Sequence, residues 1–293
     1  MRQALIAATA FALALATQPV VAQNKPAPAA TAKKAAKPAA AAPVEEKDAA
    51  TVEFEKFRTM MEESNPAELF EAQGEDFWKS IRGPKQVSLA TSCDLGLGVG
   101  IVKGAYVQMP RYFADAGKVM DAERRIVWCM IEKQGFKEAD IMKQPFASGS
   151  YTPEPTSLVT YVAANSKDMK FAVPLKDPRV KEVYEIGREV TNHRAGPYDF
   201  SCNTCHGADG KRIRMQNLPN IATPKGATTA VMGWPGYRMT GGVMLTQQWR
   251  MGDCFRQQRF PQPKYVSDTI TSLLTYMTAN ANGATYKGPG IKR

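Results

Sequence analysis

The sequence predicts a mainly α-helical protein that is built from two related halves. After residue 50 most apolar residues recur at helical spacing, and no convincing run of alternating polar and apolar residues indicates a strand. One segment occurs twice, as SLVTYVAANS at 157–166 and as SLLTYMTANA at 272–281, with six of ten positions identical. The identities include polar Thr, Tyr and Asn residues, so internal duplication explains them better than two amphipathic helices that converged on similar letters.

Length, composition and charge exclude several classes of protein. A chain of 293 residues is long enough for one large or two ordinary domains, and its 44% of hydrophobic residues can form packed cores. A disordered or fibrous chain is therefore excluded as the whole protein. Lys and Arg number 38 against 28 Asp and Glu, and the formal net charge of +10 favours anionic substrates or acidic partners.

The first 22 residues have the features of a cleaved export signal. Arg2 precedes an apolar run at 4–16, and the residues that follow fit cleavage between Ala22 and Gln23. The run is shorter than the roughly 20 apolar residues that a membrane span needs, and no later segment is long and apolar enough. We therefore expect a periplasmic protein without a membrane span, in an oxidising compartment, and we expect no nucleic-acid partner there.

A linker is predicted at 23–50, a segment that consists mainly of Ala, Pro and Lys and has no aromatic residue. Such a composition cannot bury enough apolar surface to offset the entropy of the chain, so we expect a flexible segment. The duplication divides the remaining chain into a first half at 51–172 and a second half at 173–293.

Predicted helices begin and end at typical capping residues. Asn65-Pro66 and Asp177-Pro178 each place a capping side chain before a proline at the first helical position. A glycine after an amphipathic segment indicates a helix end, as at Gly135. The predicted helices cover 67–81, 119–134, 177–193 and a final stretch that starts near residue 267.

One motif indicates cofactor chemistry, because residues 202–206 read CNTCH. The pattern CxxCH is the attachment signature of c-type haem, in which two thiols bind the porphyrin and the histidine binds iron. Cys202 and Cys205 are therefore predicted to hold one haem c covalently, with His206 as an axial ligand. A redox dithiol of the thioredoxin type would need a preceding strand, and zinc would need four ligands from a chain with five Cys and two His.

The helices around the motif agree with this assignment. One amphipathic helix precedes the motif and another ends the chain, as in a class I cytochrome c, where the haem lies between crossed terminal helices. Gly187 would permit a close helix crossing. The predicted fold is thus mainly α, with two cytochrome c-like (class I) domains in tandem, of which the first lacks CxxCH and has no haem.

Three kinds of residue are candidates for the other axial position of the iron. His193, the second histidine, precedes the motif and is possible there, although a histidine at the end of a helix is also unremarkable. Methionine is the usual ligand in such a domain, and spacing alone favours it. Cys254 is the alternative, and three arginines lie near it in sequence. Arginine lowers the pKa of a thiol and binds oxyanions through paired donors, so thiolate chemistry or an anionic substrate is indicated. The methionines are Met232, Met239, Met244 and Met251, and the arginines are Arg250, Arg256 and Arg259.

Two further cysteines, Cys93 and Cys129, lie in the first half. In an oxidising compartment a disulfide between them is the expected state, and two buried free thiols are the alternative. The chain-entropy model gives such a disulfide a stabilising effect of about 4 kcal/mol.

Four segments together resemble the SoxA family, the larger subunits of the SoxAX cytochromes of bacterial thiosulfate oxidation. They read CDLGLGVGIVKGAY at 93–106, MPRYFADAGKVMDAERR at 109–125, GPYDFSCNTCHG at 196–207 and WRMGDCFRQQRFPQP at 249–263. The resemblance covers nearly all of residues 51–293. It implies that Cys254 replaces methionine as the distal haem ligand and is the active-site sulfur, often found as a persulfide, and that Arg250 binds the anion.

The same resemblance implies an activity and partners. It indicates an L-cysteine S-thiosulfotransferase, which joins thiosulfate to a cysteine of the SoxYZ carrier protein and passes two electrons through haem to a cytochrome c acceptor. SoxX, a small cytochrome subunit, would complete a heterodimer. Because the first half lacks CxxCH, the chain resembles the single-haem branch of the family, in which a disulfide such as Cys93–Cys129 remains in that half.

Two other functions remain open from the sequence. A simple periplasmic electron-transfer cytochrome c with His/Met ligation explains the CxxCH motif equally well, but it explains neither the cysteine among arginines nor the haem-free half. A docking subunit, whose first half only binds a partner, is the other alternative.

Overall fold

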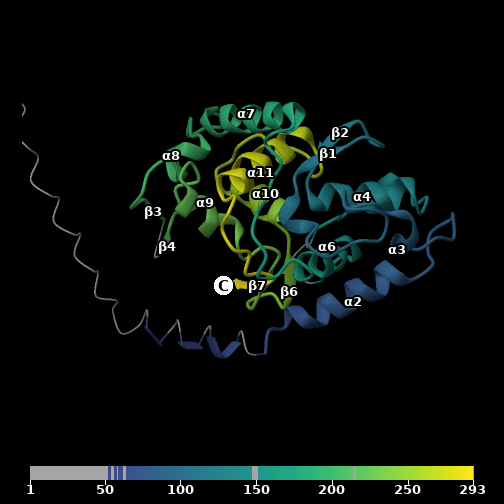
Figure 1. Cartoon of the computed structure of the whole chain (residues 1–293). Helices are drawn as coiled ribbons and strands as arrows, with labels where there is room; N and C mark the ends of the chain where they lie inside the picture. The colour runs from purple at the N-terminus through teal and green to yellow at the C-terminus, as the bar shows by residue number, and fades with distance from the viewer. Residues whose placement is uncertain are drawn as a thin grey trace, which may run out of the picture. The chain divides into compact units, whose positions relative to one another are not determined.

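Two crossed helix pairs organise the computed structural model of this chain, which describes residues 52–292 except 54–55, 58, 62–63, 147–150 and 214–215. In one pair α2 (Ala67–Lys79) packs on α6 (Glu154–Ala164), and in the other α7 (Pro178–Asn192) packs on α11 (Asp268–Asn280). Figure 1 shows α7 along α11 at the top of the view and α2 beneath α6 at the lower edge. The predicted export signal and linker lie outside the described residues.

The helix starts follow the predicted capping signals. Asp177 accepts a hydrogen bond from the amide of Arg179 at 2.9 Å, and Pro178 opens α7. The Ser267 hydroxyl accepts from the amide of Ile270 at 3.4 Å before α11. In front of α2 the side chain of Asn65 accepts from the amide of Ala67 at 3.0 Å. Each contact satisfies an amide that has no partner within its helix.

The two helix crossings are close because each places a glycine against a carbonyl oxygen. A Cβ on Gly187 would lie 2.0 Å from the oxygen of Ser272, and a Cβ on Gly74 would lie 2.0 Å from the oxygen of Ser157. Ser157 and Ser272 are the first residues of the duplicated segment. The repeated residues therefore have the same packing role in both halves, which supports the predicted duplication.

We expect Gly187→Ala to destabilise the protein by about 1–3 kcal/mol, because the new methyl group forces α7 and α11 apart. At an open position in a helix the same change would stabilise by up to about 1 kcal/mol, so the sign of the effect is diagnostic. Denaturant unfolding of Gly187→Ala measures the change, with Glu189→Ala at an exposed site of the same helix as control. An increase in stability would show that the crossing is loose.

Short strands connect the helices, and the prediction of no strands is wrong for this part of the fold. Two antiparallel hairpins recur in equivalent places, and a third pair lies between them in sequence. Each strand has only two or three residues, too few for an alternating pattern to be recognised. The hairpins are β1–β2 (Arg111–Phe113, Lys118–Met120), β3–β4 (Arg212–Ile213, Gln216–Asn217) and β5–β6 (Gly236–Arg238, Val243–Leu245), and β7 (Gly290–Lys292) pairs in parallel with β5.

The helix predicted at 119–134 is shorter than expected. Its first residues form strand β2, and α4 (Ala122–Glu132) begins after Asp121, whose carboxylate accepts from the amide of Arg124 at 2.9 Å. The remaining helices are short. They are α3 (Leu89–Ser92), a 3₁₀ turn at Tyr106–Gln108, α5 (Glu138–Ile141), α8 (Cys202–His206), α9 (Pro224–Val231) and α10 (Gln247–Gln257).

The main hydrophobic core contains residues from both halves. The ring of Tyr286, from the end of the chain, lies 5.2 Å from the ring of Tyr106 and meets the ring of Phe171 edge to face at 5.7 Å, and Val231 belongs to the same cluster. Backbone bonds join residues 168–171 to 283–286. The described residues accordingly belong to one compact unit. The division into 51–172 and 173–293 therefore describes the predicted duplication of the sequence, and it stays a prediction.

The first half contains a disulfide between Cys93, which follows α3, and Cys129 on α4. Both cysteines are 0% exposed, and their Cα atoms are 5.7 Å apart. The structure thus forms the bond that the two cysteines led us to expect. Among the described residues, no helix is both long and apolar enough to cross a bilayer.

Candidate functional site

The CxxCH residues form α8, a single turn of helix that follows α7 (Figure 1). Ser201 caps this turn: its hydroxyl accepts from the amide of Thr204 at 3.2 Å, and its own amide donates to the Thr204 hydroxyl at 2.9 Å. This reciprocal capping orders a helix too short to be stable alone. Cys202, Cys205 and His206 are thereby placed on one rigid turn, and both cysteines are free thiols.

The ring of His206 is oriented by a backbone acceptor. Its Nδ1 lies 2.8 Å from the carbonyl oxygen of Pro219, which can only accept, so Nδ1 carries the proton. Nε2 is then unprotonated, and its lone pair is available to bind a metal. Burial lowers the pKa of His206, and the charge of Arg250 lowers it further. A neutral imidazole with a free Nε2 is the form that binds iron.

Cys254, on α10, lies close enough to the motif for the thiols to interact electrostatically. Burial raises the pKa of Cys202 to about 11, and the charge of Cys254 adds to that shift. Cys205 raises the pKa of Cys254 in the same way. The structure therefore brings together the two attachment thiols, the histidine and a further sulfur. This donor set fits a covalently attached haem with His206 and Cys254 as axial ligands.

The charge of Arg250 lowers the pKa of the Cys254 thiol, as the sequence indicated, but burial outweighs this effect. Asp253, its neighbour in sequence, raises the pKa further. Arg250 is thus insufficient to make the thiolate in a buried site, whereas coordination to a metal ion deprotonates a thiol directly.

The three arginines near Cys254 have different surroundings. Arg250 interacts with Cys254 and places Nη1 3.2 Å from the carboxylate of Asp253. Arg256 binds the other oxygen of Asp253 at 2.5 Å, and Arg259 lies 5.7 Å from the ring of Tyr198. Among these three, Arg250 is therefore the one whose charge acts on the Cys254 sulfur.

Asp253 was not predicted as a site residue, although its sequence position could have indicated it. It is only 9% exposed and accepts hydrogen bonds from Arg250, Arg256 and Gln257. An acidic residue three positions from arginines on both sides lies on their helix face. Its carboxylate fixes the orientation of the Arg250 guanidinium, which leaves the remaining donors of that group free.

Of the four methionines that spacing favoured, Met232 and Met244 have roles in packing. Met244 is fully buried in β6, and its amide donates to the hydroxyl of Thr152 in the first half at 3.0 Å. Met232 packs against the main hydrophobic core. The second histidine, His193, is the exposed C-cap of α7. These placements agree with structural roles for Met232, Met244 and His193.

The first half repeats the frame of this site without its haem motif. A bridge between Arg82 and Val87 precedes α3, and an equivalent bridge between Ala195 and Phe200 precedes α8. Ser88 and Ser201 then cap the two short helices. Cys93 lies as many residues after Ser88 as His206 lies after Ser201, so the two residues are in equivalent positions. Leu89 and Ser92 occupy the places of Cys202 and Cys205.

The helices α4 and α10 are equivalent in the same way, because each follows a hairpin with matching register. Asp121 and Thr246 are their N-caps. Cys129 lies as far beyond Asp121 as Cys254 lies beyond Thr246. The disulfide of the first half therefore joins the two positions that correspond to the predicted axial ligands of the second.

An arginine precedes each of these helix cysteines by one turn, and this repeat of R-x-x-x-C was not recognised from the sequence. Arg125 is 1% exposed; it binds Asp115 through two nitrogens at 2.9 Å and lies 4.1 Å from the ring of Phe113. The side chain of Arg250 is 41% exposed. The first arginine is fully engaged in packing, whereas the second can meet an anion.

A CxxCH turn beneath crossed helices, with its histidine oriented for iron, defines a c-type cytochrome. The SoxA/TsdA cytochrome c domain family matches residues 73–171. The L-cysteine S-thiosulfotransferase subunit SoxA of Hydrogenophilus thermoluteolus is 43% identical over 82% of this chain and 87% of its own length. A SoxA subunit of Hydrogenobacter thermophilus is 34% identical over 78% and 82%. The chain belongs to the SoxA family.

A solved structure has the same fold. The crystal structure of SoxXA from P. pantotrophus matches with a TM-score of 0.65 and 24% identity, and the match covers 81% of this chain and 84% of that one. The predicted mainly helical, cytochrome c-like fold is confirmed by this likeness and by the family match.

Proposed function

We propose that this chain is the SoxA subunit of an L-cysteine S-thiosulfotransferase. It joins thiosulfate to a cysteine of the SoxYZ carrier protein. The proposal rests on the family membership and, above all, on one observation: Cys254, a half-buried cysteine one helical turn after Arg250, interacts electrostatically with that arginine and with the thiols of the CxxCH helix. A plain electron-transfer cytochrome needs neither Cys254 nor Arg250.

The charges at the site suit the substrate. Thiosulfate is a dianion, and its approach to a sulfur centre requires compensating positive charge. Arg250 offers guanidinium donors that the single contact with Asp253 leaves free. We assign Arg250 the role of holding the sulfonate group, with the sulfane sulfur directed toward Cys254.

The reaction makes one S–S bond, between the sulfane sulfur of thiosulfate and the carrier thiol. The carrier thiol loses its proton, and two electrons leave. In the first step Cys254 would form an S–S bond with the sulfane sulfur, and the two electrons would leave at this step. In the second step the carrier thiolate would attack the sulfane sulfur and the Cys254 thiolate would leave, which is an exchange at sulfur. When bound, the haem supplies the acceptor through which these electrons leave one at a time, toward a cytochrome c.

The finer assignments follow from the same site. His206 and Cys254 would hold the iron of a single haem c that Cys202 and Cys205 would attach. The first half contributes no haem because α3 has Leu89 and Ser92 in place of the attachment cysteines. SoxX is the proposed partner subunit, and the periplasm is the proposed location.

Electron paramagnetic resonance of the ferric protein tests the ligand assignment. We expect a low-spin signal of a thiolate-ligated haem in the wild type, and a shift to a His/Met signal in Cys254→Met. Met244→Leu is the control, since Met244 is fully buried in β6 and its amide donates to the hydroxyl of Thr152. A wild-type signal that Cys254→Met leaves unchanged and Met244→Leu alters would overturn the proposal in favour of an electron carrier.

A further inference from the structure

Two carboxyl groups are buried together where the halves meet. Asp121 and Glu123, at the start of α4, are 3% and 2% exposed. Within the described part of the chain neither forms a salt bridge, and the nearby Arg124 pairs instead with Asp268 at 2.6 Å. Buried carboxyl groups without a cation are costly unless hydrogen bonds satisfy them.

Glu123 satisfies part of its hydrogen-bonding capacity on a helix of the other half. Its Oε1 accepts from the amides of Gln247 at 3.1 Å and Gln248 at 3.4 Å, the first two residues of α10. Amides in the first turn have no partner inside their own helix. The hydroxyl of the N-cap Thr246 accepts from the amide of Trp249 at 3.2 Å. A side chain of the haem-free half thus completes the N-terminus of α10.

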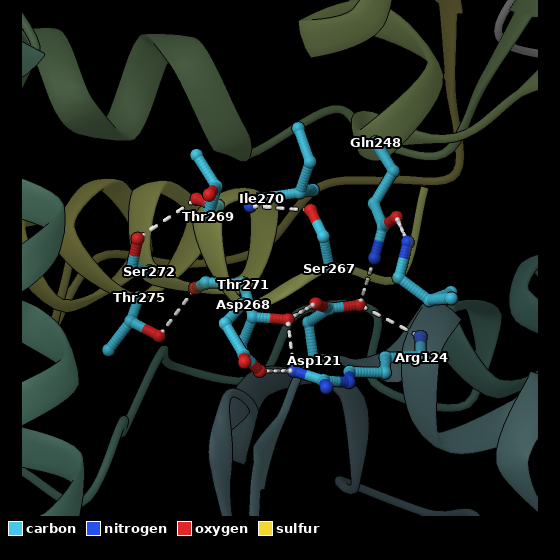
Figure 2. Close-up of polar contacts among 11 residues, drawn as sticks. Asp121, Arg124, Gln248, Ser267, Asp268, Thr269, Ile270, Thr271, Ser272 and Thr275 are labelled. Carbon is cyan, nitrogen blue, oxygen red and sulfur yellow. Dashed lines mark hydrogen bonds and ion pairs between the residues drawn. The ribbon is translucent and has the colours of Figure 1, made fainter. Parts of the chain in front are cut away.

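Asp121 reinforces this junction, as Figure 2 shows. Its two oxygens accept from the Gln248 side chain and from the Thr271 hydroxyl, both at 2.8 Å. Gln248 in turn accepts from the amide of Val266 at 2.8 Å. One buried network therefore ties α4 to α10, to α11 and to the turn before α11.

We propose that Glu123 is a positioning residue for α10: its carboxyl group anchors the start of that helix and so places Arg250 and Cys254 against the CxxCH turn. Arg250 and Cys254 lie one and two turns beyond the anchored amides. The inference rests on the function proposed for those two residues. It gives the haem-free half a direct part in the geometry of the active site.

The protonation state of Glu123 contributes to this anchoring of α10. Burial raises the pKa of Glu123 to about 8, and the charge of Asp121 contributes to the rise. The other titratable groups that face it are Tyr106 and Tyr286, whose buried hydroxyls have pKa values well above 10 and stay neutral. Protonated Glu123 can donate toward Asp121 while it accepts from α10, and both carboxyl groups are then satisfied.

Three variants of the haem-loaded protein test the proposal. Glu123→Met keeps the length of the side chain but offers no oxygen to α10, Glu123→Gln keeps the acceptor oxygen, and Glu132→Met makes the same change at an exposed position of α4. In Glu123→Met we expect amide exchange at Gln247 and Gln248 to accelerate at least tenfold and the ferric low-spin signal to shift or split. Wild-type exchange in this variant would overturn the proposal, and so would a wild-type signal if Cys254→Met shows that Cys254 binds the iron.

The conservative variants complete the experiment. At a pH well below 8, where Glu123 is protonated, Glu123→Gln and Glu132→Met are expected to keep both the exchange rates and the signal of the wild type. A change in Glu132→Met as large as in Glu123→Met would contradict a specific role. Cys254→Met separates the two hypotheses. If it leaves the signal unchanged, the ligand assignment fails, whereas faster α10 exchange in Glu123→Met still supports the anchoring.

A pH comparison keeps the proposal testable if Glu123→Met does not fold. A pKa raised from 4.5 to about 8 gives stability that is fully present below pH 4.5 and lost as the pH rises to about 8. We therefore expect the unfolding midpoint of the wild type to fall relative to Glu123→Gln across that range, with faster exchange at Gln247. A difference that is independent of pH would overturn the role of the protonated carboxyl group.

Discussion

Replacing Cys254 by alanine is expected to lower kcat/KM for thiosulfate conjugation by a factor of about 10³ or more. The variant lacks the sulfur that we propose receives the sulfane group, and removal of a covalent nucleophile typically costs three or more orders of magnitude. Haem attachment should persist, because Cys202 and Cys205 remain on a helix capped by Ser201. The measurement is a conjugation assay with the carrier protein, alongside the haem content of each variant.

The matched control for this loss is Arg256→Ala on the same helix. Arg256 is exposed and binds Asp253, and its charge is not among those that act on Cys254. We expect this variant to retain activity within a few-fold of the wild type. Equal activity of Cys254→Ala and the wild type would remove Cys254 from the reaction, whatever its place at the iron.

Loss of the first-half disulfide should have the largest effect on stability. Replacing both Cys93 and Cys129 by alanine is expected to lower the free energy of unfolding by about 2–5 kcal/mol. The bond closes a loop of 36 residues, and both sulfurs are fully buried, so the substitutions also remove packing contacts. Denaturant unfolding measures the loss, and the double substitution leaves no buried free thiol.

Reductant provides the control for the disulfide. If the covalent bond stabilises the fold, a thiol reductant should lower the unfolding midpoint of the ferrous wild type but not that of the double variant. Working with ferrous protein in both conditions removes any contribution from reduction of the haem. A wild type that is insensitive to reductant even when unfolded and refolded in it would show that packing alone holds α3 to α4.

Local signals in the sequence sufficed for the long helices and for the haem motif. Asp177-Pro178 and Ser267 start α7 and α11 as their capping chemistry predicts. Gly187 lies at the crossing for which its missing side chain is needed. The hairpins escaped detection because strands of three residues carry no measurable period, and β2 was taken as the first turn of α4 for the same reason.

Contacts between segments that lie far apart in the chain could not be predicted from the sequence. The pKa of Cys254 depends on how deeply α10 is buried, which three nearby arginines in the sequence do not reveal. The anchoring of α10 by Glu123 joins residues more than a hundred positions apart. One signal was readable but unused, since the R-x-x-x-C pattern of Arg125 and Cys129 recurs at Arg250 and Cys254.

The correspondence between Cys93 and His206 has an evolutionary consequence. In a duplicated haem domain with a cysteine already at the distal position, one substitution of histidine by cysteine at the proximal position puts two sulfurs where two axial ligands stood. The covalent bond then keeps the same two segments together that coordination to iron would have held. A cofactor can be lost by such a route without loss of the fold. The half without the haem motif can then still support the structure of the half that carries it.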